Sequence, residues 1–362
     1  MTSKNISTVV AGFKGQIAFV EDIRMQLAPI SVCAIPRFLK ERDTPLHHNV
    51  NHVIEARREV RMVAILIKQI LVMLVMMSVG VALTKLKMLD EHGVSQLSNV
   101  ALYVATPAVV ISSLAIEFDK AQLQVGGLVM LFYTGLLVLA VLVGRIGCGR
   151  ADRVGQFAVA FSNSGFVGIP LIQGILGDEY TFYVTMTMVV GTIVFWTYGV
   201  FLMSGDNNEV SVKKILTNPN FIAVLIGLAL FFAPIKLPYI IEQSLTGMKN
   251  LNTGLGMIIL GAYLGQSNVM LMITDTRLYK ACILRLIVAP LVSILMLMLM
   301  PASFEVRMVL MIVAAAPAAS ATSMLAQKYG GDYQYGTGLS IGTTVLSMAT
   351  MPAVLALAMQ VL

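Results

Sequence analysis

An apolar stretch that is long enough to cross a bilayer, yet interrupted at its centre, constrains this chain most. It runs from Gln156 to Gly177 and reads QFAVAFSNSGFVGIPLIQGILG. Gly165 and Gly168 are poor helix formers and Pro170 lacks a backbone donor, so a helix is expected to break near them. Non-helical backbone at membrane depth persists only where protein or a water-filled cavity satisfies its polar groups. The stretch therefore predicts a broken membrane helix beside a binding site, with a plain proline kink as the alternative.

A second interrupted apolar stretch lies near the end of the sequence. Leu310–Asp332 reads LMIVAAAPAASATSMLAQKYGGD, with Pro317 and a run of small and hydroxylic residues at its centre. A shift of 154 positions places Gly177-Asp178 on Gly331-Asp332. Such a match predicts an internal duplication, provided that the same shift carries whole spans onto spans.

The composition is that of a membrane protein. Of the 362 residues, 57% are apolar and 12% are charged, and that charged fraction is about half the usual one for soluble domains. Several apolar runs are long enough to span a bilayer as helices. The short alternating segments of a transmembrane barrel are absent. We therefore predict an all-α polytopic membrane protein.

The apolar runs predict ten membrane spans. Adding 154 to the bounds of the first five spans gives ranges that coincide with the last five, so the two interrupted stretches are span four of each half. Because five is odd, the second half must enter the membrane from the opposite side, and the repeats are predicted to be inverted. The spans are Met62–Thr84, Val94–Ile116, Leu123–Arg145, Val154–Gly177, Thr181–Met203, Ile215–Phe232, Leu237–Gly265, Leu278–Met300, Val306–Lys328 and Tyr335–Val361.

These spans divide the chain into four parts. Residues 1–61 hold nine of the 25 Lys and Arg residues and no run that could span. We interpret them as a hydrophilic N-terminal extension that is either disordered or upstream of a natural start at Met62. The first five-helix repeat follows at 62–203, a short linker at 204–214, and the second, inverted repeat at 215–362.

The loop charges predict an orientation. The loops after odd-numbered spans hold most of the basic residues, and the alternate loops hold few. By the positive-inside rule the odd loops and the linker are cytoplasmic, and both ends of the ten-span core face outward. The basic residues of the odd loops are Lys85, Lys87, Arg145, Arg150, Arg153, Lys213, Lys214, Arg277, Lys280 and Lys328.

Motifs for enzymatic chemistry are absent from the sequence. The only histidine after residue 61 is His92, and no H-E-x-x-H, G-x-S-x-G or G-x-x-x-x-G-K-[ST] pattern occurs. Cys33, Cys148 and Cys282 are isolated, so neither a disulfide framework nor a zinc site is indicated. We expect no enzyme activity, cofactor, metal or nucleic-acid partner.

Polar residues near the breaks form the candidate binding site. Helices that begin at a break direct unpaired N–H groups and a positive dipole end into the cavity, which suits a carboxylate. The hydroxyl groups could instead bond within their own helices. The candidate substrate-binding residues are Asn163, Ser164, Ser320, Thr322, Ser323, Lys249 and Asn99, and the helix-breaking residues are Gly165, Gly168, Pro170, Pro317 and Pro107.

Three cations lie two turns or more inside predicted spans. For Lys68 and Arg285, extension of the side chain to the membrane interface is the favoured explanation. Lys249 lies deeper, where it either pairs with Glu242 or attracts an anionic substrate. The acidic residues after residue 61 all lie at or near span ends, which argues against a buried acid that couples transport to protons or sodium.

Four motifs, taken together, resemble the auxin efflux carrier family. They are SNSGFVGIPL at Ser162–Leu171, ATPAVVISSL in span two, TNPNFIAVLIG at Thr217–Gly227 and APAASATSMLAQKYGGD in span nine. The resemblance covers about Met62–Leu362. It implies ten helices in two inverted repeats, as in bile-acid symporters and sodium/proton antiporters, with broken helices four and nine crossing beside a substrate site.

The resemblance also implies roles for single residues. Asn163 and Pro170 correspond to the family's crossover asparagine and proline, and Pro317 corresponds to the proline of the second break. Plant members carry a long hydrophilic loop between the halves, whereas this linker resembles that of prokaryotic members. Bacterial relatives include malate and malonate permeases.

We therefore expect a secondary transporter (permease) of small organic anions in the bacterial inner membrane, working by alternating access at the crossover. One alternative is a sodium- or proton-coupled symporter of the bile-acid type, which sodium removal or an ionophore would reveal. A second alternative is a membrane sensor, which would give no counterflow in liposomes. The expected partners are the anion and the lipid bilayer, and a homodimer is left open.

Overall fold

The computed structural model describes residues 45–116, 119–206, 209–210, 212–233, 237–266 and 275–362. Residues 56–362 form one compact unit, to which the following description refers. Helix α2 (Pro45–Lys85) begins before Met62, where the first span was predicted to start. Residues 1–44 lie outside the described residues, so the interpretation of the N-terminal extension stays a prediction.

Within those ranges the secondary structure is helical, and a single β-bridge joins two chain segments. Six helical segments are long and apolar enough to cross a membrane, and Ser164–Ile175 and Pro219–Phe232 are shorter apolar helices. This agrees with the predicted polytopic all-α membrane protein, while the ten-span inverted repeat stays a prediction. The six segments are Ile67–Lys85, Glu91–Leu114, Lys120–Cys148, Asp178–Ser204, Thr276–Leu297 and Tyr333–Val361.

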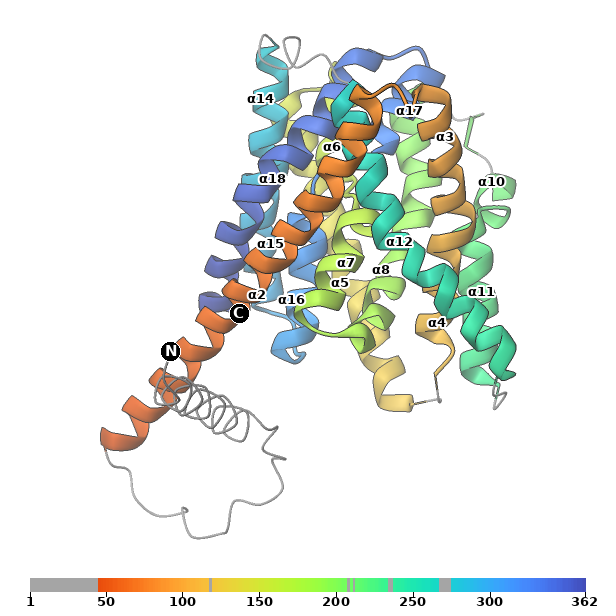
Figure 1. The fold of residues 1–362 in the computed structure, drawn as a ribbon. Helices are drawn as coiled ribbons and strands as arrows, with labels where there is room; N and C mark the ends of the chain where they lie inside the picture. The colour runs from red at the N-terminus through yellow and green to blue at the C-terminus, as the bar shows by residue number, and fades with distance from the viewer. Residues whose placement is uncertain (1–44, 117–118, 207–208, 211, 234–236, 267–274) are drawn as a thin grey trace, which may run out of the picture. The chain divides into compact units, whose positions relative to one another are not determined.

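One group of helices packs around α12 (Tyr239–Gln266). Helix α12 contacts α3 (Glu91–Val100) and α4 (Thr106–Leu114), and α4 also packs against α11 (Pro219–Phe232). In Figure 1 these helices lie side by side, with α3 and α4 following each other along the bundle.

Helix α2 crosses α12 in this group so closely that glycines are required. A Cβ atom at Gly80 would collide with the carbonyl oxygen of Ile258, and one at Gly261 would collide with the carbonyl oxygen of Met77. Small residues at such positions let two membrane helices approach backbone to backbone.

The second group contains the two interrupted stretches. In the first half, α5 packs against α6 and α8. In the second half, α15 packs against α16, and α17 packs against α18. The helices are α5 (Lys120–Cys148), α6 (Arg153–Ala160), α7 (Ile169–Ile175), α8 (Thr181–Val194), α9 (Val200–Ser204), α14 (Thr276–Ile283), α15 (Ala289–Leu297), α16 (Phe304–Ala315), α17 (Ala321–Lys328) and α18 (Tyr333–Val361). The short helix α10 (Val212–Leu216) lies in the linker region between the halves.

Several of these helices are joined through widened turns. The π-helical segments are η2 (Ala101–Ala105), η3 (Ser164–Gly168), η5 (Phe195–Gly199) and η7 (Leu284–Val288), and η4 (Asp178–Tyr180) is a 3₁₀ turn. Pro107, Pro170 and Pro290 follow η2, η3 and η7 at the first turns of α4, α7 and α15. Proline cannot donate to the preceding turn, and the π turn is a local adjustment that accommodates the loss.

Carboxylates at the ends of the predicted spans cap these helices. Each accepts a hydrogen bond from a backbone N–H group in the first turn of the helix that follows it, which satisfies a donor that the helix cannot satisfy itself. The capping residues are Asp90, Asp119, Asp152, Asp275 and Asp332.

The α2–α12 crossing generates the first prediction. Gly261→Ala should destabilise the protein by about 1–3 kcal/mol, because the added methyl group meets the backbone of Met77 rather than a side chain that can move. The measurement is the thermal unfolding midpoint of detergent-purified protein. Gly254→Ala, on the same helix, is the control, since a Cβ atom there meets nothing within 4 Å. Equal midpoints for the two variants would contradict the prediction.

Candidate functional site

The first interrupted helix breaks at Phe161–Asn163, just before the predicted helix breakers Gly165, Gly168 and Pro170, which lie in the helix that follows. Helix α6 ends at Ala160, and Phe161 adopts extended backbone angles, with φ −104° and ψ 122°. The helix resumes as η3 at Ser164, after Asn163. Pro170 lies in the first turn of α7, directly after η3, and the widened turn of η3 accommodates the hydrogen bond that proline cannot donate.

The second interrupted helix breaks at the predicted proline. Helix α16 ends at Ala315, and Ala316 is extended, with φ −61° and ψ 149°. Pro317 follows, and helix α17 begins at Ala321.

The two breaks pair with each other. Ser162 and Ala318 form an antiparallel bridge. The Asn163 N–H donates to the carbonyl oxygen of Pro317 at 2.8 Å, and the Ala319 N–H donates to the carbonyl oxygen of Phe161 at 2.9 Å. Each broken helix therefore satisfies polar backbone groups of the other, as non-helical backbone at membrane depth requires.

Neighbouring helices satisfy further groups at the crossing. The Ala318 N–H donates to Oγ1 of Thr343, on α18, at 3.0 Å. Nδ2 of Asn252, on α12, donates to the carbonyl oxygen of Gly165 at 3.3 Å, and Oδ1 of the same side chain accepts from Oγ1 of Thr106 at 3.0 Å. Asn252 is fully buried, so it ties the first break to the other helix group.

The expectation that Arg285 extends to the membrane interface is wrong. Its side chain is only 2% exposed. Its guanidinium donates to the carbonyl oxygens of Ala316 and Val159, which lie at the ends of α16 and α6. These carbonyl groups have no partner within their helices, so they hold the cation inside the protein. Lys68, by contrast, is exposed as expected.

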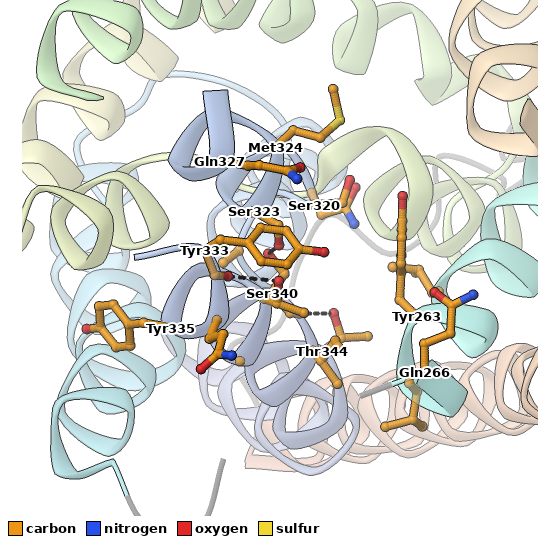
Figure 2. A pocket seen from close by; sticks show the side chains of 18 of the residues that line it. Tyr263, Gln266, Ser320, Ser323, Met324, Gln327, Tyr333, Tyr335, Ser340 and Thr344 are labelled. Carbon is orange, nitrogen blue, oxygen red and sulfur yellow. Dashed lines mark hydrogen bonds between the residues drawn. The ribbon is translucent and has the colours of Figure 1, made fainter. Parts of the chain in front are cut away.

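A cavity of 850 Å³ lies between the two helix groups. Its inner part reaches Asn163 and Ser320 at the crossing, and its mouth includes the exposed residues Glu91, Arg277 and Asp332. Figure 2 shows Tyr263 and Gln266, from α12, on one side of the space and the hydroxyl side chains of α17 and α18 across from them. These facing hydroxyl residues are Ser320, Ser323, Ser340 and Thr344.

Two amide groups in the cavity wall have no hydrogen-bond partner among the described residues. They are Nδ2 of Asn163, whose residue is 7% exposed, and Nε2 of Gln266. They belong to opposite helix groups. Buried donors in proteins nearly always have an acceptor, so two unpaired amide groups on residues that line one cavity are suited to a ligand that supplies acceptors.

An ionic cluster lies at the mouth of the cavity. Arg277 bonds to Asp275 at 2.7 Å and to Asp332 at 3.1 Å, and its guanidinium stacks on the ring of Tyr335. The Tyr335 hydroxyl donates to Asp152 at 2.9 Å. Hydrogen bonds from Arg277 hold the pKa of Asp275 below its usual range. Arg277, Asp275 and Asp332 are thus paired with one another, and Tyr335 links Arg277 to Asp152.

The structure brings four of the predicted binding residues together and leaves three apart. Asn163, Ser320, Ser323 and Asn99 line the cavity. Ser164, Thr322 and Lys249 are not among its lining residues. The Thr322 hydroxyl donates to the carbonyl oxygen of Ala319 within its own turn at 2.7 Å.

Lys249 pairs with Asp178 rather than with Glu242. Asp178 lies in the loop after α7, 71 residues before Lys249 in the sequence. Only the tertiary fold could therefore reveal this partner. The ion pair joins α12 of one helix group to the second group.

Sequence reasoning missed several residues of the cavity wall. Thr337, Ser340 and Thr344 recur at intervals of three and four on α18, which is a polar stripe on one helix face that periodicity could have found. Gln266 and Tyr263 carry no such signal, because they end an otherwise apolar run.

Comparison with known proteins agrees with a transport role. Residues 65–355 match the family model described as "Membrane transport protein". A protein of Methanothermobacter thermautotrophicus named "Uncharacterized transporter" is 28% identical over 302 residues, which cover 78% of this chain and 95% of that protein. A second uncharacterized transporter, from Methanocaldococcus jannaschii, is 25% identical over 206 residues, covering 53% of this chain and 67% of that protein.

The crossing generates the second prediction. Thr343→Val should destabilise the protein by about 1–3 kcal/mol, because the buried N–H group of Ala318 loses its acceptor. The measurement is the thermal unfolding midpoint in detergent. Thr350→Val is the control, because that hydroxyl group bonds only to the carbonyl oxygen of Leu346 in its own helix. A Thr343→Val midpoint as high as that of the control would show that the side chain does not support the crossing.

Proposed function

Because the chain belongs to the membrane transport protein family, the family of the auxin efflux carriers, we propose that it is a secondary transporter of small organic anions that works by alternating access. Multi-pass insertion follows from the family and the apolar helices, and the cell inner membrane is the proposed location. The observation that carries the substrate class is the pair of unpartnered amide groups on Asn163 and Gln266, two residues that line one cavity.

The charge pattern of the crossing favours an anion. Asn163 precedes η3 and Ser320 precedes α17, and neither side chain caps its helix. The first turns of both segments therefore present N–H groups and positive dipole ends beside the cavity. A carboxylate supplies the acceptors that these groups and the two amides lack. The cavity, at 850 Å³, has room for a small organic acid.

The helix bounds support an inverted repeat. Shifted by 154 positions, α6 falls at 307–314, inside α16 (Phe304–Ala315). The same shift carries α7 to 323–329, over α17 (Ala321–Lys328). Two copies of a unit with an odd number of spans run in opposite directions through the membrane, which brings the two breaks together at mid-depth.

The arrangement suggests a carrier that is open on one side and closed on the other. The cavity mouth lies at α3, α14 and α17, next to loops that the charge distribution predicts to be cytoplasmic. Away from the mouth, the Lys249–Asp178 ion pair and a hydrogen bond from Gln69 to the carbonyl oxygen of Pro170 join the two helix groups. Asp178 lies in a loop predicted to face outward. Movement of one group against the other would break these contacts and close the mouth.

The cavity generates the third prediction. Asn163→Ala and Gln266→Ala should each raise the KM for malate about tenfold or more, because each removes one hydrogen bond to a charged ligand. The measurement is counterflow of radiolabelled malate, malonate and lactate in proteoliposomes. Gln243→Ala, an exposed position on the same helix as Gln266, is the matched control. Unchanged transport in both variants, at normal expression, would remove these side chains from the site.

The ion pair generates the fourth prediction. Lys249→Gln should slow anion transport, and Asp178→Asn should slow it to a similar degree, because each breaks the same contact between the helix groups. The effect should be at most about fivefold, since Asp178 is 58% exposed and exposed pairs contribute about 1 kcal/mol or less. The exchanged pair, Lys249→Asp with Asp178→Lys, should recover the rate. A loss with Lys249→Gln that Asp178→Asn does not reproduce would assign Lys249 to attraction of the anion instead.

A further inference from the structure

Arg285 stands apart from the other charged residues. It is the one buried Asp, Glu, Lys or Arg side chain among the residues whose burial the structure describes. Burial of a cation is costly unless hydrogen-bond or ionic partners compensate, and an intramembrane charge is usually functional. Its hydrogen-bond acceptors among the described residues are backbone carbonyl groups: Nε and Nη2 donate to Ala316 at 3.0 and 2.7 Å, and Nη1 donates to Val159 at 2.9 Å.

The two acceptors are the C-terminal ends of the half-helices that meet at the crossing. Val159 lies in the last turn of α6, and Ala316 is the C-terminal cap of α16. The last carbonyl groups of a helix lack partners and carry the negative end of the helix dipole. In broken-helix transporters, such ends and the unwound carbonyl groups beside them are where a coupling Na⁺ binds.

We propose that Arg285 is a tethered substitute for a coupling cation. Its guanidinium neutralises both negative helix ends, so the crossing is complete without bound sodium. A guanidinium stays protonated in proteins and its stem is covalent, so this charge neither dissociates nor crosses the membrane with the substrate. Tyr133 of α5 lies near the guanidinium and also close to Ser162 of the first break, and no buried carboxylate is present among the described residues.

The proposal makes Arg285 a positioning residue that acts through the breaks. Arg285 holds the negative ends together, while the positive ends, at Asn163 and Ser320, lie beside the cavity. The inference rests on the proposed function, because it gives the energy source for movement of that anion. Without a co-transported cation, the anion carries its own charge across the membrane, so flux follows the membrane potential and the anion gradient alone.

The first test measures whether sodium binds at all. The unfolding midpoint of the purified wild-type protein is measured in NaCl and in choline chloride of equal ionic strength, without substrate. We expect equal midpoints. A midpoint that rises saturably with Na⁺ over choline would overturn the proposal while leaving the proposed function intact.

The second test measures flux. Malate-induced currents are recorded from proteoliposomes on a solid-supported membrane, with sodium and then with choline on both sides. We expect a current with the sign of the anion and the same amplitude in both salts. Malate accumulation driven by a sodium gradient would overturn the proposal. Absence of flux for malate, malonate and lactate would count against the proposed function instead, and the sodium titration of the midpoint would still decide the role of Arg285.

Variants separate the charge from the packing. Arg285→Gln should reduce malate counterflow at least tenfold, whereas Arg285→Lys, which keeps a cation, should retain a measurable rate that is still independent of sodium. Lys280→Gln, an exposed cation on α14, is the matched control. A folded Arg285→Gln protein with wild-type flux would overturn the proposal. If that variant does not fold, the two wild-type measurements decide.

Discussion

The hydrogen bonds between the two broken helices are the interaction on which the rest of the structure depends. Each helix loses backbone hydrogen bonds where it breaks inside the membrane region. The backbone hydrogen bonds Asn163–Pro317 and Phe161–Ala319 replace part of them. In hydrocarbon, no solvent could replace those partners. Side chains from α12, α18 and η7 satisfy further backbone groups at the crossing. Each break therefore supplies hydrogen-bond partners that the other needs, which accounts for the presence of two broken helices in one chain.

The crossing also places the negative and positive ends of the broken helices on different sides, and no carboxylate of the described residues takes part. The negative ends of two half-helices meet at Arg285, and the positive ends of their continuations border the cavity. Acidic side chains act instead at the helix starts, as caps or as partners of Arg277 and Lys249. A site of this kind attracts an anion through backbone dipoles and neutral amides, and its cationic group is already engaged on the opposite side of the crossing.

The sequence predicted features that depend on residues close together along the chain. It did not predict contacts between segments that are distant in the sequence. Pro317 marks the second break because the backbone limits of proline act within one turn. The first break lies at Phe161–Asn163, so Asn163 follows from its position there, whereas Gly165, Gly168 and Pro170 lie in the helix that resumes beyond it. The burial of Arg285 and the Lys249–Asp178 pair could not be predicted, because both depend on chain segments that meet only after folding. Gln266 was missed for the same reason.

The widened turns before Pro107, Pro170 and Pro290 have a consequence for how this fold diversifies. A π turn holds one residue more than an α turn and so rotates everything beyond it by about 100° around the helix axis. The parts of a helix on either side of the turn then present different faces, and their apolar stripes do not line up. Gain or loss of a single residue at one of these three places would rotate the part of the helix beyond it around the helix axis. The part before it would keep its packing.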